Sequence, residues 1–273
     1  MLRMKSETGW WLITHPDHAH LAGEFAAAWG NEQFRKPEPR ARVLHGIASH
    51  DDGWAARDAH PSITREGKPS AFSTELVGKY SAFEEIDIQE YLAVRKRAVR
   101  IIANEDAYAG LLILMHTYNL LTERADRSTI GEEGLALLDA FLDEQRAYKT
   151  QLLAEISRDE SLSTLEKSHQ TIEEHFRLLQ ACDNLSLLTC VAFASPSHLL
   201  HPLPFNNGSN STVKVLPIGP REFRLSPWPF DEDTRSFEFP ARHVEGKMFA
   251  TSAALDSAFH TAKPQTLTVN LTS

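Results

Sequence analysis

Apolar residues recur at helical spacing through the first two thirds of the chain. This pattern buries one side of a helix, and it predicts helices over about 16–29, 40–50, 87–103, 105–124, 131–157 and 161–194. Thr14, Pro16 and Asp17 favour the start of the first helix, because a hydroxyl caps free N–H groups and a proline or an acid suits the first turn. The last segment is apolar on most sides, so we expect it at the centre.

After Ser195 the pattern changes to short alternating segments punctuated by proline, which is typical of strands. Strands are predicted over 213–218, 221–226, 236–240 and 265–272, and a hairpin over 1–14. We therefore expect a mainly α protein, α+β overall, in which the N-terminal hairpin and the C-terminal strands form a small antiparallel β-sheet. The predicted organisation is a single domain over 1–273, with a helical core at about 15–194 and a β region at about 195–273 that packs with the hairpin.

The composition is ordinary for a soluble globular protein, with 42% hydrophobic and 24% charged residues. A net charge of −9 without a basic tract argues against a protein that coats nucleic acid. The N-terminus lacks the apolar core of a signal peptide, and no apolar run reaches transmembrane length. We expect a cytoplasmic protein without nucleic-acid or membrane partners, and we leave a homo-oligomer open. Cys182 and Cys190, in one apolar stretch, are interpreted as buried reduced thiols.

Several ionisable residues stand on the apolar faces of these predicted helices. They are His18, the adjacent pair His50 and Asp51, His116 and Asp183. Charged or imidazole groups in a core are costly unless they meet one another or a metal ion. The five residues are therefore the predicted metal ligands.

Other histidines compete for the first position. His18 shares a face with Leu21 and Phe25, whereas His20 aligns with Glu24 on a solvent face and His15 lies at the helix entry. His18 is the prediction on this ground.

The later ligands also have alternatives. His116 interrupts an apolar run, and His45 and His60 remain as replacements for it. Gln180 and Ser186, three residues to either side of Asp183, are expected to support that ligand. His175 is a weaker candidate.

The residues that follow Asp51 suggest further roles. Asp52 is interpreted either as a general base, its predicted catalytic role, or as a carboxylate that caps a helix, and Trp54 as part of the site wall. Arg57, Arg65 and Lys68 lie in an irregular stretch that would clamp a phosphate if the substrate carries one, although solvated loop charges are the favoured interpretation.

The order His18, His50-Asp51, Asp183 resembles the H…HD…D pattern of the HD-domain superfamily of metal-dependent phosphohydrolases. The resemblance implies a helical core in which each ligand comes from a different helix. The added His116 is similar to the extra histidines with which some HD families hold a second metal. The segments HDDGW and LQACDNLSL also resemble an uncharacterised bacterial family, a domain of unknown function, over nearly the whole chain.

The leading functional hypothesis is a metal-dependent phosphohydrolase that acts on a small phosphate ester or nucleotide. Mixed histidine and carboxylate ligands suit one or two divalent transition metal ions, namely Mn, Fe, Ni, Co or Zn. The alternatives are an HD-type di-iron oxygenase and a non-catalytic ligand-binding or regulatory protein. No nucleophile elbow and no glycine-rich phosphate loop is present in the sequence.

Overall fold

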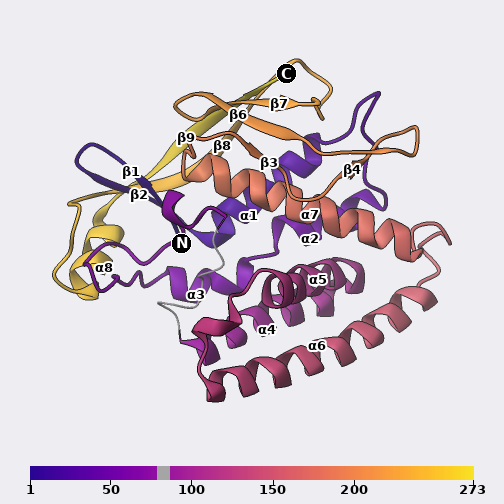
Figure 1. The fold of residues 1–273 in the computed structure, drawn as a ribbon, viewed down its shortest axis with the longest axis horizontal. Coiled ribbons are helices and arrows are strands. Elements are labelled where there is room, and N and C mark those ends of the chain that lie inside the picture. The colour runs from indigo at the N-terminus through magenta and orange to yellow at the C-terminus, as the bar shows by residue number, and fades with distance from the viewer. Residues whose placement is uncertain (79–86) are drawn as a thin grey trace.

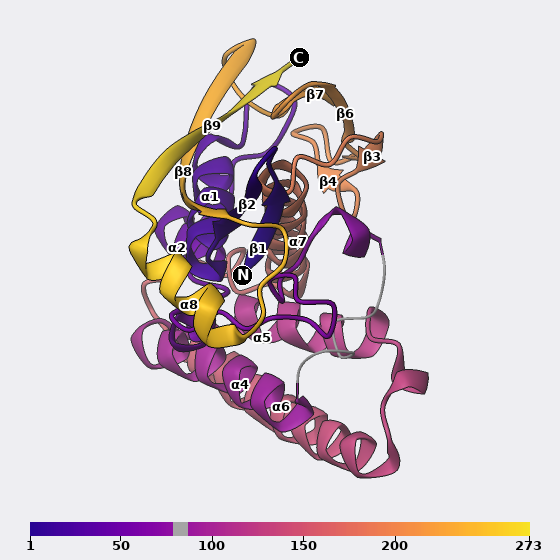
Figure 2. The ribbon, with the colours of Figure 1, turned by 90° about the vertical axis from the view of Figure 1, so that its left-hand side faces the viewer.

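The computed structural model describes residues 1–78 and 87–273, and it arranges them in three layers (Figures 1 and 2). A curved sheet covers one side, a middle layer holds α1, α2 and α7, and α4, α5 and α6 form the opposite side. The helices of the described ranges are α1 (His15–Ala28), α2 (Arg40–Ala48), α3 (Ala55–Asp58), α4 (Ile88–Glu105), α5 (Ala107–Glu123), α6 (Glu132–Arg158), α7 (His169–Cys190) and α8 (Ser252–Thr261). The α+β fold expected from the sequence is confirmed.

The sheet joins the two ends of the chain. Its strands are β1 (Leu2–Lys5), β2 (Gly9–Ile13), β3 (Ser197–His198), β6 (Lys214–Gly219), β7 (Glu222–Ser226), β8 (Thr234–Glu245) and β9 (Pro264–Thr272). Their order is β1-β2-β8-β9-β7-β6-β3, so the predicted N-terminal hairpin pairs with the C-terminal strands. A separate pair is formed by β4 (Leu203–Pro204) and β5 (Asn210–Ser211).

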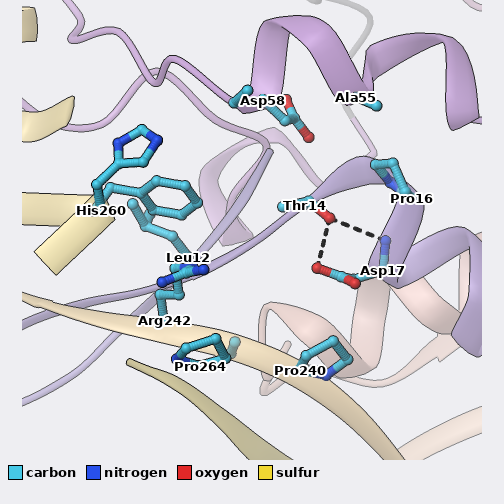
Figure 3. A pocket seen from close by; sticks show the side chains of 13 residues that line it. Leu12, Thr14, Pro16, Asp17, Ala55, Asp58, Pro240, Arg242, His260 and Pro264 are labelled. Atoms are coloured by element: carbon cyan, nitrogen blue, oxygen red, sulfur yellow. Dashed lines mark hydrogen bonds between the residues drawn. The ribbon is translucent and has the colours of Figure 1, made fainter. Parts of the chain in front are cut away.

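The first helix starts as its sequence predicts. The Thr14 hydroxyl accepts a hydrogen bond from the Asp17 backbone N–H at 3.1 Å and donates one to the Asp17 carboxylate at 2.6 Å (Figure 3). Pro16 occupies the first turn, where its missing N–H costs nothing. This cap fixes the direction in which α1 leaves the sheet.

Several details differ from the prediction. The last long helix begins at His169 rather than near 161, because Ser168 caps it and Asp159 binds Ser161 in a turn before it. Helix α8 is not among the predicted helices, although the hydroxyl of Thr251 caps its first turn and is a start signal that the sequence contains. The sheet is antiparallel except between β7 and β9, which run parallel because β9 inserts between β8 and β7.

Helix α7 lies at the centre, as its apolar sides predict. It contacts α1, α2 and α5 and also reaches β1 and β4. Cys182 and Cys190 are buried on it as free thiols. Burial raises the pKa of both thiols, so they stay protonated. None of the helices in the described ranges is long and apolar enough to cross a membrane.

Helices α4 and α5 approach closely where Gly110 faces Ala103. A Cβ added at Gly110 would overlap the Cα and Cβ atoms of Ala103. We expect Gly110→Ala to lower the free energy of unfolding by about 1 to 3 kcal/mol, because overpacking forces the backbone to move. This corresponds to a fall in Tm of roughly 3 to 10 °C in a thermal melt. Gly131→Ala is the matched control, since no described atom lies within 4 Å of its added Cβ. Equal melting of the two variants would contradict the tight contact.

Candidate metal centre

The five predicted ligands meet at one place in the structure. His18 comes from α1, His50 and Asp51 follow α2 directly, His116 lies in α5 and Asp183 in α7. All five are buried, with between 0% and 7% of each residue exposed. Four segments far apart in the sequence therefore bring their ionisable side chains to the same point.

The donor atoms form two triads that share His50. One consists of His18, His50 and Asp51 and the other of His50, His116 and Asp183, with the donor atoms of each triad within 4.8 Å of one another. Donors that share an ion at about 2.1 Å lie about 3.0 to 3.4 Å apart in tetrahedral or neighbouring octahedral positions. The separations in this site run from 3.1 Å up to 4.8 Å, so both triads could hold an ion once their donors move slightly together.

The distances in the first triad are the shorter ones. His18 Nε2 lies 3.1 Å from Asp51 Oδ2, and His50 Nε2 lies 4.0 Å from the same oxygen. Asp183 adjoins this triad, because its Oδ1 lies 3.3 Å from His50 Nε2. In the second triad His116 Nε2 lies 3.9 Å from Asp183 Oδ2. Asp183 thus presents one oxygen to His50 and the other to His116.

Hydrogen bonds behind the rings determine which imidazole nitrogen faces the centre. His50 Nδ1 lies 2.7 Å from the Ile47 carbonyl, which only accepts, so Nδ1 carries a proton. The Ser186 hydroxyl donates to the Asp183 carbonyl at 2.8 Å and therefore accepts from His18 Nδ1 at 2.9 Å. In both rings Nε2 is left to face the carboxylates. This is the arrangement by which buried partners prepare histidine for metal binding.

His116 is held less firmly. Its Nδ1 lies 3.5 Å from Gln180 Nε2, a long distance for a hydrogen bond. The same amide group contacts Asn119 at 2.9 Å and His201 at 2.5 Å. Gln180 and Ser186 were predicted to support Asp183, but their side chains contact His116 and His18 instead, and Ser186 reaches Asp183 only at its backbone carbonyl.

Arg95 on α4 supplies a positive charge that the sequence-based set of site residues does not include. Its Nη1 lies 2.5 Å from Asp51 Oδ1, whereas His18 contacts the other oxygen of that carboxylate. Although burial opposes ionisation, Arg95 and His50 hold the pKa of Asp51 well below 3.8. Arg95 shares its buried helix face with Tyr91, Val99 and Ile102. The sequence feature that could have identified it is therefore the same as for the predicted ligands, a charged residue on an apolar helix face.

His50 balances the remaining negative charge. Burial acts to lower its pKa, but Asp51 and Asp183 more than offset this and raise it to about 9. Two carboxylates, one guanidinium and one imidazolium then sum to zero. Burial lowers the pKa of His116 to about 3, so that ring is neutral.

A cavity of about 440 Å³ opens beside these ligands, and we call it the central cavity. His18, Asp51, His116 and Asp183 contribute to its wall. A second cavity, of about 440 Å³, lies between α1, α3 and the sheet near Asp58 and Arg242 (Figure 3), and none of the five predicted ligands lines it. Four of the five predicted ligands therefore face the central cavity and none faces the other.

The residues predicted around the ligands divide into two groups. Trp54, Arg57 and Lys68 line the central cavity, with Trp54 buried and the two cations partly exposed. Asp52 and Arg65 are not among the residues that line it, and Arg65 is exposed. The structure therefore does not bring Asp52 and Arg65 to the cavity. Asp52 begins a short 3-10 turn, in which adjacent side chains point about 120° apart, and Arg65 is exposed in a separate turn.

The alternative histidines lie elsewhere, with one exception. His20 is exposed, His45 lies 3.7 Å from Glu105 and His60 lies 3.3 Å from Asp256. His175 is bound to Tyr108 at 2.8 Å. His15 does line the central cavity, where its ring stacks on Trp54 at 4.4 Å and Nδ1 lies 3.0 Å from Asp58.

A family model described as "Protein of unknown function (DUF3891)" matches residues 1–246. The chain belongs to this family. The match covers all five ligands and the residues that line the central cavity, and it agrees with the resemblance to an uncharacterised domain family. Searches of the curated proteins and of the solved structures find no match for this DUF3891 chain.

Protonation and metal binding compete for His50 Nε2. The pKa of His50 is raised to about 9, above about 6.5 for an unfolded chain, so its charged form stabilises the protein fully below about pH 6.5. This stabilisation is lost as the pH rises through 9. A divalent ion needs the neutral ring, and binding must therefore release a proton at neutral pH.

We expect the apparent affinity for Zn²⁺ to rise about tenfold per pH unit from roughly pH 7 to 9 and then to level off. His116 adds no dependence in this range, because it is already neutral. Competition against a chelator of known proton dependence measures the affinity. An affinity that does not change between pH 7 and 9 would show that His50 is not a ligand.

Proposed function

We propose that the protein is a metal-dependent phosphohydrolase with an HD-like centre, acting on a small phosphate ester or nucleotide. The observation that carries this proposal is His50 Nε2. This atom is shielded from solvent and has no hydrogen-bond partner in the described part of the chain, although two carboxylates face it. Its distance to Asp183 is short, but the alignment is not that of a hydrogen bond. A buried nitrogen between two carboxylates needs positive charge, which either its own proton or a metal ion supplies.

The donor set fits a divalent transition metal ion. The first triad, His18 Nε2, His50 Nε2 and Asp51 Oδ2, would hold it. Asp183 Oδ1, which lies 3.3 Å from His50 Nε2 but outside that triad, would have to approach to become a fourth ligand. This mixture of imidazole and carboxylate suits Mn, Fe, Ni, Co or Zn. Ser186, the Ile47 carbonyl and Arg95 already orient three of these four ligands. A bound ion would supply Lewis-acid polarisation of a phosphoryl oxygen and a lowered pKa for an attacking water.

The arrangement favours one ion over two. His50 has a single free nitrogen, because Nδ1 is bonded to Ile47. It therefore serves one triad at a time, and an ion in the second triad would keep only His116 and one oxygen of Asp183. The second triad is the observation behind the alternative of a di-iron oxygenase, and the sharing of His50 counts against that alternative.

The walls of the central cavity suit a small anionic molecule. Arg57 and Lys68 stand at its polar side, whereas Leu120 and Leu187 provide apolar surface. Lys68 is paired with Glu66 at 2.8 Å and Arg57 with Glu90 at 3.6 Å, so each would exchange a surface partner for the substrate. A volume of about 440 Å³ accommodates a phosphate ester of modest size.

The test is metal content together with turnover in Asp183→Asn. This variant keeps the shape of the side chain and removes one ligand charge, and it leaves Asp51 with Arg95. We expect the wild type to hold about one ion and to release phosphate from phosphomonoesters or nucleotides. Asp183→Asn should lose at least about tenfold in metal affinity, consistent with the loss of an anionic ligand, and its turnover should fall below detection. Elemental analysis and a phosphate-release assay measure the two quantities.

Asp143→Asn is the matched control, because Asp143 is 68% exposed and pairs only with Arg146 among the described residues. It should keep both metal and turnover. Two iron atoms per chain with oxygen consumption would instead support the oxygenase. A folded wild type that takes up none of the five metals on reconstitution would overturn the proposal and leave the non-catalytic alternative.

A further inference from the structure

Arg95 is fixed in place on the wall of the central cavity. Nη1 lies 2.5 Å from Asp51 Oδ1 and Nε lies 3.2 Å from the Tyr91 hydroxyl. The guanidinium carbon lies 5.3 Å from the ring centres of both Trp54 and Tyr91. Two hydrogen bonds and two aromatic rings hold the plane of the group, so little freedom is left to lose when it binds something else.

The third guanidinium nitrogen of Arg95, Nη2, is available to donate hydrogen bonds to a ligand. Nη2 has no hydrogen-bond partner among residues 1–78 and 87–273, and Arg95 lines the cavity that the ligands also line. Arginine presents five N–H groups in one plane, and the contacts above use one on Nε and one on Nη1. The remaining donors lie beside Asp51, next to the candidate metal centre.

We infer that Arg95 binds an oxygen of the substrate's phosphoryl group while its other edge holds Asp51. The inference rests on the proposed function, and it assigns to one side chain both the orientation of a ligand and the recognition of the substrate. A rigid guanidinium with spare donors on the wall of this cavity is suited to an oxyanion. Tyr91 acts as a positioning residue, because its hydroxyl holds Nε.

The charge of the site agrees with this role. Asp51, Asp183 and Arg95 sum to −1, and a divalent ion with a neutral His50 brings the site to +1. Without Arg95 the loaded site would be neutral and would give an anion little attraction. Arg3 also lines the cavity but is paired with Glu75 at 3.3 Å, and Arg57 and Lys68 are likewise paired with acids. Arg95 is as deeply buried as Arg3, but its partner is a proposed ligand and its Nη2 keeps no hydrogen-bond partner in the described ranges.

The experiment is calorimetric titration of the zinc-loaded protein with inorganic phosphate, with zinc content measured on the same samples. Arg95→Lys keeps a charge for Asp51 but cannot also present a planar fork. We expect its zinc content to match the wild type and its phosphate affinity to fall about 10- to 100-fold, the effect of losing a hydrogen bond to a charged group. Tyr91→Phe keeps the ring, and we expect a loss of about 3- to 10-fold at unchanged zinc content.

Arg97→Lys on the exposed face of the same helix is the matched control and should bind phosphate as the wild type does. Acetate tests whether the site prefers a phosphoryl group, and it should bind at least about tenfold more weakly than phosphate. Unchanged phosphate affinity in Arg95→Lys, equal affinity for acetate, or loss of zinc in Arg95→Lys would each overturn the inference. A wild type that binds zinc but no phosphate would overturn it while leaving the metal centre intact, whereas a wild type without zinc would overturn the proposed function itself.

Discussion

The buried negative charges of Asp51 and Asp183 must be compensated, and this requirement determines how the centre of the protein is arranged. Two carboxylates in a helical core are costly unless positive charge and hydrogen bonds compensate them. Arg95 forms an ion pair with Asp51 on one side of the site. His18 and His50 face the two carboxylates from the other side. The packing of α1, α2, α4, α5 and α7 brings these groups together, so the position of each helix and the charge balance of the site depend on each other.

Helix α7 connects the chemistry to the rest of the fold. It carries Asp183, a proposed ligand, and within one turn on either side it carries Gln180 and Ser186, which contact His116 and His18. His201, between β3 and β4, contacts Gln180 and so connects the C-terminal β region to the candidate metal centre. The hydrogen bonds that leave Nε2 of His18 and His50 facing inward therefore come from neighbouring elements rather than from the ligands alone, as is common in metal sites.

The cluster of buried ionisable residues was predictable because the same rule applies to each of its members. An ionisable residue on an apolar helical face must find a partner, and His18, His116 and Asp183 were recognised in this way. Arg95 satisfies the rule equally well, yet nothing in its spacing connects a cation with a set of metal ligands. The sharing of His50 between two triads could not be predicted, because ring orientation depends on contacts that periodicity does not describe.

The same limit explains the differences in the loop and the tail. Asp52 begins a short 3-10 turn and Arg65 lies in a loop turn, where α-helical or strand spacing does not fix the direction of a side chain, and neither residue lines the central cavity. The pairing of the hairpin with the C-terminal strands was predictable because each segment alone would leave apolar side chains in contact with water. The parallel pair β7–β9 depends on how β9 inserts into the sheet, which strand patterns do not reveal.

X-ray absorption spectroscopy of the zinc-loaded protein tests the proposed metal centre most directly, because it reports the atoms around the ion rather than the reaction. We predict nitrogen and oxygen neighbours at about 2.0 to 2.2 Å, no sulfur neighbour, and imidazole scattering that weakens in both His18→Gln and His50→Gln. A sulfur neighbour, or a spectrum that stays the same in both variants, would contradict this centre.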